Sequence, residues 1–250
     1  MTTRSTTTLL LAFLFTFTAF AQDAKEIIRK AEEKMRGKES AYMEMTIEVV
    51  RPKWTRTMAL KSWSKGDDKS LMVLTAPAKD QGTAFLKREK EVWNWVPSIE
   101  RSIKMPPSMM MQSWMGTDLS NDDLVRESSN VTDYTHKLAG DSTIDGRKCW
   151  KVILTPKPDA PVVWGKVVAF VDQEHYVQLK AEQYDEDGFM VNKMIGSDIK
   201  TMDGVTLASR LELIPVEKDG HKTVMIIDDI KFNEPYEDGF FTVQNMKRIR

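Results

Sequence analysis

The stretch YMEMTIEV, residues 42–49, alternates strictly between two kinds of side chain. Methionine, isoleucine and valine take the odd positions, while Tyr42, two glutamates and a threonine take the even ones. A period of two is typical of a β-strand with one buried face and one polar face. The next segment, Trp54 to Lys65, continues in the same way, with Met58 and Leu60 on one parity and Trp63 on the other.

Turn signals show how such strands are connected. Asp-Gly pairs occur at 145–146, 187–188, 203–204, 219–220 and 238–239, and the middle three separate strand-like runs. Asp-Gly between alternating segments is the strongest short-range signal for a hairpin. We therefore predict a mainly β fold with a few helices, in which about eleven antiparallel strands follow one another as a meander. A long meander avoids exposed edges by curling into a barrel or half-barrel.

Two helices are predicted beside the strands. The first spans Asp23 to Gly37, where Asp23 and Glu26 make a capping-box pattern and Gly37 is a stop signal. Its apolar positions fall on one stripe, so this helix should lie on an apolar surface. The second is a short helix with an N-cap at residues 120–124.

The N-terminus reads as a targeting segment. Arg4 precedes an apolar run at residues 9–17, and Ala19-Phe20-Ala21 fits the small-x-small cleavage rule. We expect residues 1–21 to be a signal peptide, and residues 22–250 to form one exported domain. The formal net charge of −1 argues against a nucleic-acid binder, which would need a basic face. With a single cysteine, Cys149, the chain has no internal disulfide.

No catalytic or metal-binding set emerges. The three histidines, His136, His175 and His221, have no ligand-spaced neighbours, and no phosphate-cradling glycine loop or nucleophile elbow is present. The acids at 118, 122 and 123 fail the calcium-loop pattern, so helix capping is the better interpretation. We predict no enzyme, no metal and no cofactor.

Methionine and tryptophan dominate what remains. Five methionines crowd residues 104–116, directly after a strand that carries Trp93 and Trp95 on one side and Val92 and Val96 on the other. Methionine suits surfaces that adapt to variable shapes. The run is therefore either an adaptable apolar binding surface or filler for an irregular core, and the strand before it should be covered on both faces.

The same region carries a family resemblance. The motifs VWNWVP (92–97), RSIK (101–104), SWMGTD (113–118) and NDDL (121–124) resemble the outer membrane lipoprotein-sorting protein family of the LolA-like superfamily, in its larger branch. APAKDQGTAFL (76–86) and FFTV (240–243) look like the same branch.

The resemblance implies an unclosed antiparallel β-barrel whose concave side is covered by an N-terminal helix and a lid segment. It also implies a periplasmic carrier for acyl chains of lipoproteins or of another lipid, working between an RND-type or ABC-type membrane transporter and an outer-membrane acceptor. Two alternatives stay open. One is an envelope-stress sensor of the RseB type, and the other is an exported hydrolase using Cys149 with His136.

On the carrier hypothesis, nine apolar residues are expected to line the cavity or its lid: Met43, Met45, Trp54, Met58, Trp93, Trp95, Met110, Trp114 and Met115. The mechanism would be transfer without reaction, and the methionine run would act as a mobile gate.

Overall fold

The structure is a computed structural model that describes residues 23–37, 39–89, 91–125, 129–160 and 162–249. The predicted signal peptide therefore lies outside the described residues. None of the helices in the described part is long and apolar enough to cross a membrane.

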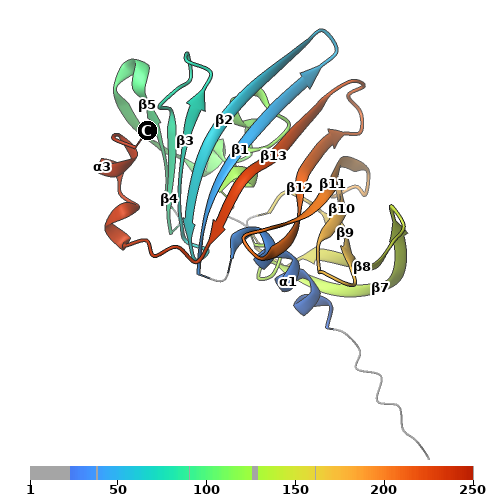
Figure 1. Ribbon diagram of the computed structural model, residues 1–250. Coiled ribbons are helices and arrows are strands. Elements are labelled where there is room, and N and C mark those ends of the chain that lie inside the picture. The colour runs from blue at the N-terminus through green and yellow to red at the C-terminus, as the bar shows by residue number, and fades with distance from the viewer. Residues whose placement is uncertain (1–22, 38, 90, 126–128, 161, 250) are drawn as a thin grey trace, which may run out of the picture.

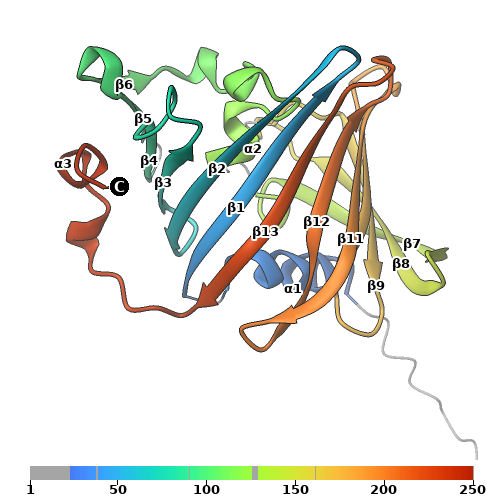
Figure 2. The same ribbon diagram turned by 45° about the horizontal axis from the view of Figure 1, so that its top comes forward.

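The described residues form one sheet of thirteen antiparallel strands, ordered β6-β5-β4-β3-β2-β1-β13-β12-β11-β10-β9-β8-β7. The sheet curls strongly but does not close, because its edge strands β6 and β7 do not pair (Figure 1, Figure 2). The strands are β1 (Ser40–Arg51), β2 (Trp54–Lys65), β3 (Lys69–Ala76), β4 (Ala84–Arg88), β5 (Glu91–Val96), β6 (Arg101–Met105), β7 (Tyr134–Ile144), β8 (Arg147–Pro156), β9 (Lys166–Asp172), β10 (Gln178–Tyr184), β11 (Met190–Met202), β12 (Val205–Pro215) and β13 (Lys222–Phe232).

The predicted mainly β, unclosed architecture is confirmed, with two differences. Thirteen strands form in place of about eleven. Pairing is sequential except at the centre, where β1 pairs with β13 and thereby joins two meanders into one sheet.

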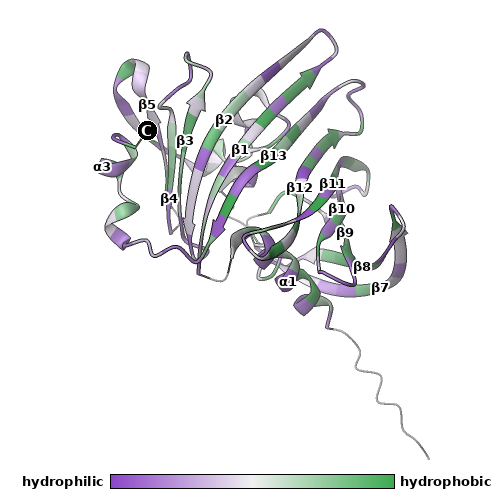
Figure 3. Ribbon diagram, viewed as in Figure 1, coloured by the Kyte–Doolittle hydropathy of each residue, from purple (hydrophilic) through white to green (hydrophobic). Residues whose placement is uncertain are grey.

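The alternation of residues 42–49 is preserved in β1. Met45 lies opposite Leu60, and Ile47 lies opposite Met58, so these side chains share the concave face of the sheet. Figure 3 shows apolar and polar bands alternating along β1, β2 and β13. The concave face of this half carries a buried cluster that includes Met58, Met72 and Phe85.

Helix α1 (Ala24–Arg36) lies inside the curve of the sheet (Figure 2). Its apolar stripe, Ala24, Ile27, Ile28 and Ala31, is buried against the inner side of β8 to β10. Asp23 caps the helix by accepting a hydrogen bond from the Lys25 backbone N–H at 3.0 Å. The predicted capping box is only half formed, because the Glu26 carboxylate pairs with Arg29.

The convex face of β3 to β5 has its own cover. The C-terminal segment, residues 233–249, includes the 3₁₀ turn η4 (Asp238–Phe240) and helix α3 (Val243–Met246), and it runs along this face (Figure 1). Phe241 and Met246 are fully buried there against Leu71, Val73 and Leu86. The strand β5 is thus apolar on both faces and covered on both, as predicted.

Candidate functional site

A cavity of about 330 Å³ lies inside the curl of the sheet. Its walls come from the concave face of the strands, from α1, and from the connection between the edge strands β6 and β7. We call residues 106–125 of that connection the lid segment. It contains the 3₁₀ turns η2 (Pro107–Met109) and η3 (Trp114–Gly116) and the short helix α2 (Asn121–Val125).

One wall of the cavity is apolar and rich in methionine. Its side chains come from β1 and β10 to β13: Met43, Met45, Ala181, Met194, Leu207, Leu211, Met225 and Ile227. Met35 of α1 and Tyr134 of β7 complete the enclosure. Burial raises the pKa of the Tyr134 phenol to about 12, as expected for a group at a poorly hydrated surface. Hydrocarbon of variable shape suits such a wall, since methionine side chains repack readily.

Polar side chains gather where β2, β3 and β4 meet the cavity. Ser62, Ser64 and Ser70 line it there, together with the buried side chain of Lys87. Lys87 Nζ donates a hydrogen bond to the Asp67 carbonyl at 2.8 Å. The cavity is therefore amphipathic: the methionine wall accommodates hydrocarbon, and this end can hydrogen-bond a polar group.

The lid segment is held together by its own hydrogen bonds. The Asn121 side-chain amide donates to the Met109 carbonyl at 2.8 Å, and the backbone N–H of Trp114 donates to the Leu119 carbonyl at 2.8 Å. Ser120 and Asp123 exchange hydrogen bonds in a capping box, because Asp123 N–H reaches Ser120 Oγ at 3.0 Å and Ser120 N–H reaches the Asp123 carboxylate at 2.8 Å. The predicted N-capped helix is confirmed. These local bonds connect residues 109–123 of the lid segment to one another.

The lid segment seats two apolar side chains on the concave face of β1 to β6. Met110 and Trp114 are almost fully buried there, and the Trp114 ring meets Phe85 edge-on with ring centroids 6.0 Å apart. The buried Trp114 indole N–H has no hydrogen-bond partner among the described residues. An unpaired buried donor costs about 1–3 kcal/mol, so the apolar surroundings of the Trp114 side chain stabilise it less than a fully satisfied site would.

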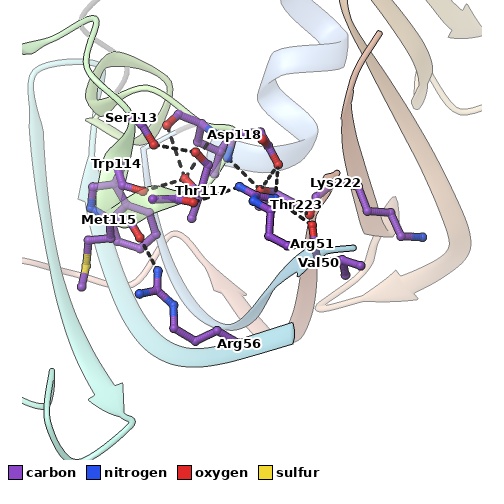
Figure 4. Close-up of polar contacts among 12 residues, drawn as sticks. Val50, Arg51, Arg56, Ser113, Trp114, Met115, Thr117, Asp118, Lys222 and Thr223 are labelled. Atoms are coloured by element: carbon purple, nitrogen blue, oxygen red, sulfur yellow. Dashed lines mark hydrogen bonds and ion pairs between the residues drawn. The ribbon is translucent and has the colours of Figure 1, made fainter. Parts of the chain in front are cut away.

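A polar clasp ties the lid segment to the rim of the sheet (Figure 4). Arg51, in β1, forms an ion pair with Asp118 at 2.9 Å and donates to the Gly116 carbonyl at 2.9 Å. Thr223 Oγ1 donates to the Asp118 carboxylate at 2.8 Å. Arg56 of β2 donates to the carbonyl of Met115, whose backbone is left-handed with φ 47°.

The nine residues expected at the cavity or lid fall into three groups. Met43 and Met45 line the cavity. Met58, Met110, Trp114 and Met115 form the contact between the lid segment and the sheet, beside the cavity and not in its wall.

The remaining three lie elsewhere. Trp93 and Trp95 pack on the convex face against the C-terminal segment, since their parity on β5 is opposite to that of Val92. Trp54 sits at the β1–β2 turn and is half exposed. None of these three contributes to the cavity wall.

Sequence reasoning missed the clasp. The sequence predicts helix capping for Asp118, but this acid is the buried partner of Arg51 and lies three residues before α2 begins. Acids clustered at the start of a helix are a local signal for capping, whereas the partners Arg51 and Thr223 are remote in sequence. Among the hydrogen bonds of the described residues, the capping interaction with Ser120 is made by Asp123.

The hypothetical hydrolase pair is not assembled. Cys149 is fully buried, and burial raises the pKa of its thiol. In the β7–β8 register Cys149 faces Ser142, whereas His136 faces Leu154. Five residues of extended strand separate the two positions by about 17 Å. Cys149 and His136 therefore cannot act as a nucleophile–base dyad.

Three solved structures share this fold over nearly their whole length. A LolA superfamily protein from Nitrosomonas europaea superposes with a TM-score of 0.75 at 23% identity, covering 88% of this chain and 98% of that chain. A putative outer membrane lipoprotein-sorting protein domain from Vibrio parahaemolyticus gives 0.78 at 22% identity, covering 90% and 98%. A DUF1329 family protein from Desulfovibrio piger gives 0.80 at 22% identity, covering 89% and 97%.

At this level of identity the three structures establish the fold. A family model described as "Uncharacterized protein" matches residues 66–248, which is most of the chain. No curated protein sequence matches the chain.

Proposed function

We propose that this chain, which belongs to the family described as "Uncharacterized protein" and has the fold of a LolA superfamily protein, is a periplasmic carrier that holds acyl chains of a lipoprotein or another lipid in its concave cavity. On this proposal, residues 1–21 direct export, and a membrane transporter and an outer-membrane acceptor load and unload the protein. The observation that carries the proposal is the methionine-lined cavity enclosed by a separately hydrogen-bonded lid segment.

The size of the cavity fits hydrocarbon of modest length. A volume of 330 Å³ corresponds to roughly eleven water-sized spaces. Burying roughly ten methylenes at about 0.8 kcal/mol each would contribute about 8 kcal/mol, which offsets much of the cost of leaving a bilayer. The cavity in its present form therefore suits one acyl chain.

Movement of the lid segment would enlarge this space. Met110 and Trp114 cover a surface of Met58, Leu60 and Met72 that is as apolar as the cavity wall and lies next to it. If the lid segment withdraws, this surface joins the cavity and further acyl chains can take the place of the two side chains. The exchange of one apolar partner for another changes little buried area, which keeps the barrier low.

The test is to identify bound lipid. Protein purified under native conditions from an envelope fraction should carry lipid in native mass spectra. The variant Ala181→Trp, which puts an indole into the cavity, should carry at least tenfold less. Ala139→Trp places the same side chain on the exposed edge strand β7, so its lipid content should equal that of the wild type. A wild-type protein that is free of lipid, or equal lipid in all three, would overturn the proposal.

A further inference from the structure

Three hairpin turns at one end of the sheet present exposed apolar side chains. Trp54 in the β1–β2 turn is 51% exposed, Phe189 in the β10–β11 turn 69%, and Val216 in the β12–β13 turn 41%. At the opposite end of the same strands, the turns at 66–68, 173–177 and 203–204 carry none of the exposed large apolar residues. The apolar tips are therefore concentrated at one end, which we call the tip surface.

The three turns adjoin one another (Figure 1, Figure 2). Gly220 packs so closely on the β1–β2 turn that a Cβ at this position would lie 3.2 Å from Pro52 Cγ. The Val216 N–H donates to the Val191 carbonyl at 2.8 Å, which connects the β12–β13 turn to β11 just beyond Phe189. Trp54, Val216 and Phe189 thus belong to one continuous surface.

Two hydrogen bonds close the turn that carries Phe189. Phe189 N–H donates to the Asp185 carboxylate at 2.8 Å, and Asp185 N–H donates to the Phe189 carbonyl at 3.0 Å. An aromatic side chain presented on a closed turn loses little conformational entropy on binding, which is the property of an interface anchor.

The charges around these tips define the partner. The exposed charged residues of the three turns are Lys53, Glu186, Asp187, Glu217, Lys218 and Asp219, an excess of two acids. A bilayer with anionic lipids repels such a surface, and segments that lie on membranes carry Lys and Arg beside their aromatic residues. A protein surface with an apolar centre and a basic surround complements it.

We propose that the tip surface is the docking site for a protein partner whose contact area is apolar at its centre and basic around it. The surface also reaches the clasp. Arg51, which holds Asp118 of the lid segment, lies with its guanidinium 5.8 Å from the centroid of the Trp54 ring. A partner that contacts Trp54 would therefore also affect Arg51, the residue that holds the lid segment through Asp118. The docking site itself does not depend on the proposed carrier function, but this coupling does.

The test is photo-crosslinking in intact cells. Benzoylphenylalanine replaces Trp54, Phe189 or Val216 in separate strains, and Asp68 or Glu174 at the opposite end in two controls. The three tip positions should give an adduct with one and the same protein, identified by mass spectrometry, and the controls should not. Asp187→Lys combined with Glu217→Lys should lower the adduct yield about tenfold.

Binding measurements with the purified partner complete the test. Phe189→Ser and Trp54→Ser should each weaken its affinity at least tenfold, and Phe189→Ser, which does not touch the clasp, should leave co-purified lipid unchanged. Equal adducts from the controls, adducts only with a second copy of this chain, or co-flotation with phosphatidylcholine–phosphatidylglycerol vesicles would overturn the docking site. Absence of co-purified lipid from the wild type, with the adducts retained, would overturn only the carrier function and the coupling.

Discussion

At the scale of single residues, two tryptophans that look alike in sequence have opposite roles. Trp114 is buried in the seat of the lid segment, whereas Trp54 is half exposed at a turn. We expect Trp114→Ala to lower the free energy of unfolding by about 3–5 kcal/mol because it leaves a large void. Trp54→Ala should change it by no more than about 0.5 kcal/mol. Urea unfolding of both variants measures the difference, and equal losses would contradict the assignment.

Glu212 gives the chain a defined response to acid. Burial alone would raise the pKa of its carboxyl, but hydrogen bonds from Lys222 at 3.0 Å and Arg210 at 2.8 Å outweigh burial and hold the pKa below its ordinary value. Because the folded pKa lies below the unfolded one, the stabilisation is complete above about pH 4.5 and is lost as the pH falls through the folded pKa.

The expected outcome follows from this sign. Glu212→Gln should be less stable than the wild type at neutral pH, and the gap should narrow as the pH falls below 4.5. Urea unfolding at a series of pH values measures the gap. Glu217→Gln, at an exposed turn, is the matched control and should follow the wild-type curve. If the difference in unfolding free energy between the wild type and Glu212→Gln stays constant with pH, the Glu212 carboxylate is not the cause of the acid response.

The sequence could assign residues to the cavity only where one face of a strand is polar. In β1 the even positions are polar, so the pattern assigns Met43 and Met45 to the inner face, and both residues line the cavity. In β5 both parities are apolar, and no local rule says which one faces inward. The cover over Trp93 and Trp95 comes from the far end of the chain, through Phe240 and Val243, so it leaves no trace in the neighbouring sequence.

At the scale of elements, the clasp should govern how tightly the lid segment is held. Asp118 and Arg51 are both largely buried, and removing one partner of a buried pair costs about 3–5 kcal/mol. We expect Arg51→Met to speed amide hydrogen exchange within residues 106–125 while the amides of β1 and β13 stay protected. Lys104→Met, which breaks the exposed pair with Glu91, should leave the exchange of the lid segment unchanged. Uniformly faster exchange across the sheet would mean that the clasp supports the whole fold.

The C-terminal segment should affect stability without affecting the cavity. Phe241 is fully buried on the convex face, on the far side of the sheet from the methionine wall. Phe241→Ala should therefore lower the free energy of unfolding by about 3–5 kcal/mol. Native mass spectra of the folded variant should show the same bound lipid as the wild type. Loss of lipid would mean that the two faces are coupled.

Elements with local signals were predictable, and their long-range pairing was not. The stripe of α1, the cap of α2 and the Asp-Gly turns all follow from neighbouring residues. The pairing of β1 with β13 joins segments from opposite ends of the domain, and no short-range rule specifies it. A meander read turn by turn also cannot reveal that β6 and β7 separate to become the two edges.

At the scale of the whole molecule, ligand binding should raise stability by mass action. Delipidated protein with lauric acid at one hundred times its dissociation constant should gain about 2.7 kcal/mol. For a domain of this size the melting temperature should then rise by about 5–10 °C. Calorimetry measures the shift, and Ala181→Trp should show none. An equal rise in that variant would place the fatty acid outside the cavity.

The pairing of β1 with β13 at the centre of the sheet also dictates when the protein can fold. Each meander can form by local hairpins, but joining them requires residues 40–51 to meet residues 222–232. Closing so long a loop is slow, since contacts distant in sequence are entropically costly to establish. A chain that emerges from a ribosome or a translocation channel N-terminus first therefore exposes the inner strand β1 as an unpaired edge until the last strand arrives. Chaperone protection during biogenesis should matter most in that interval.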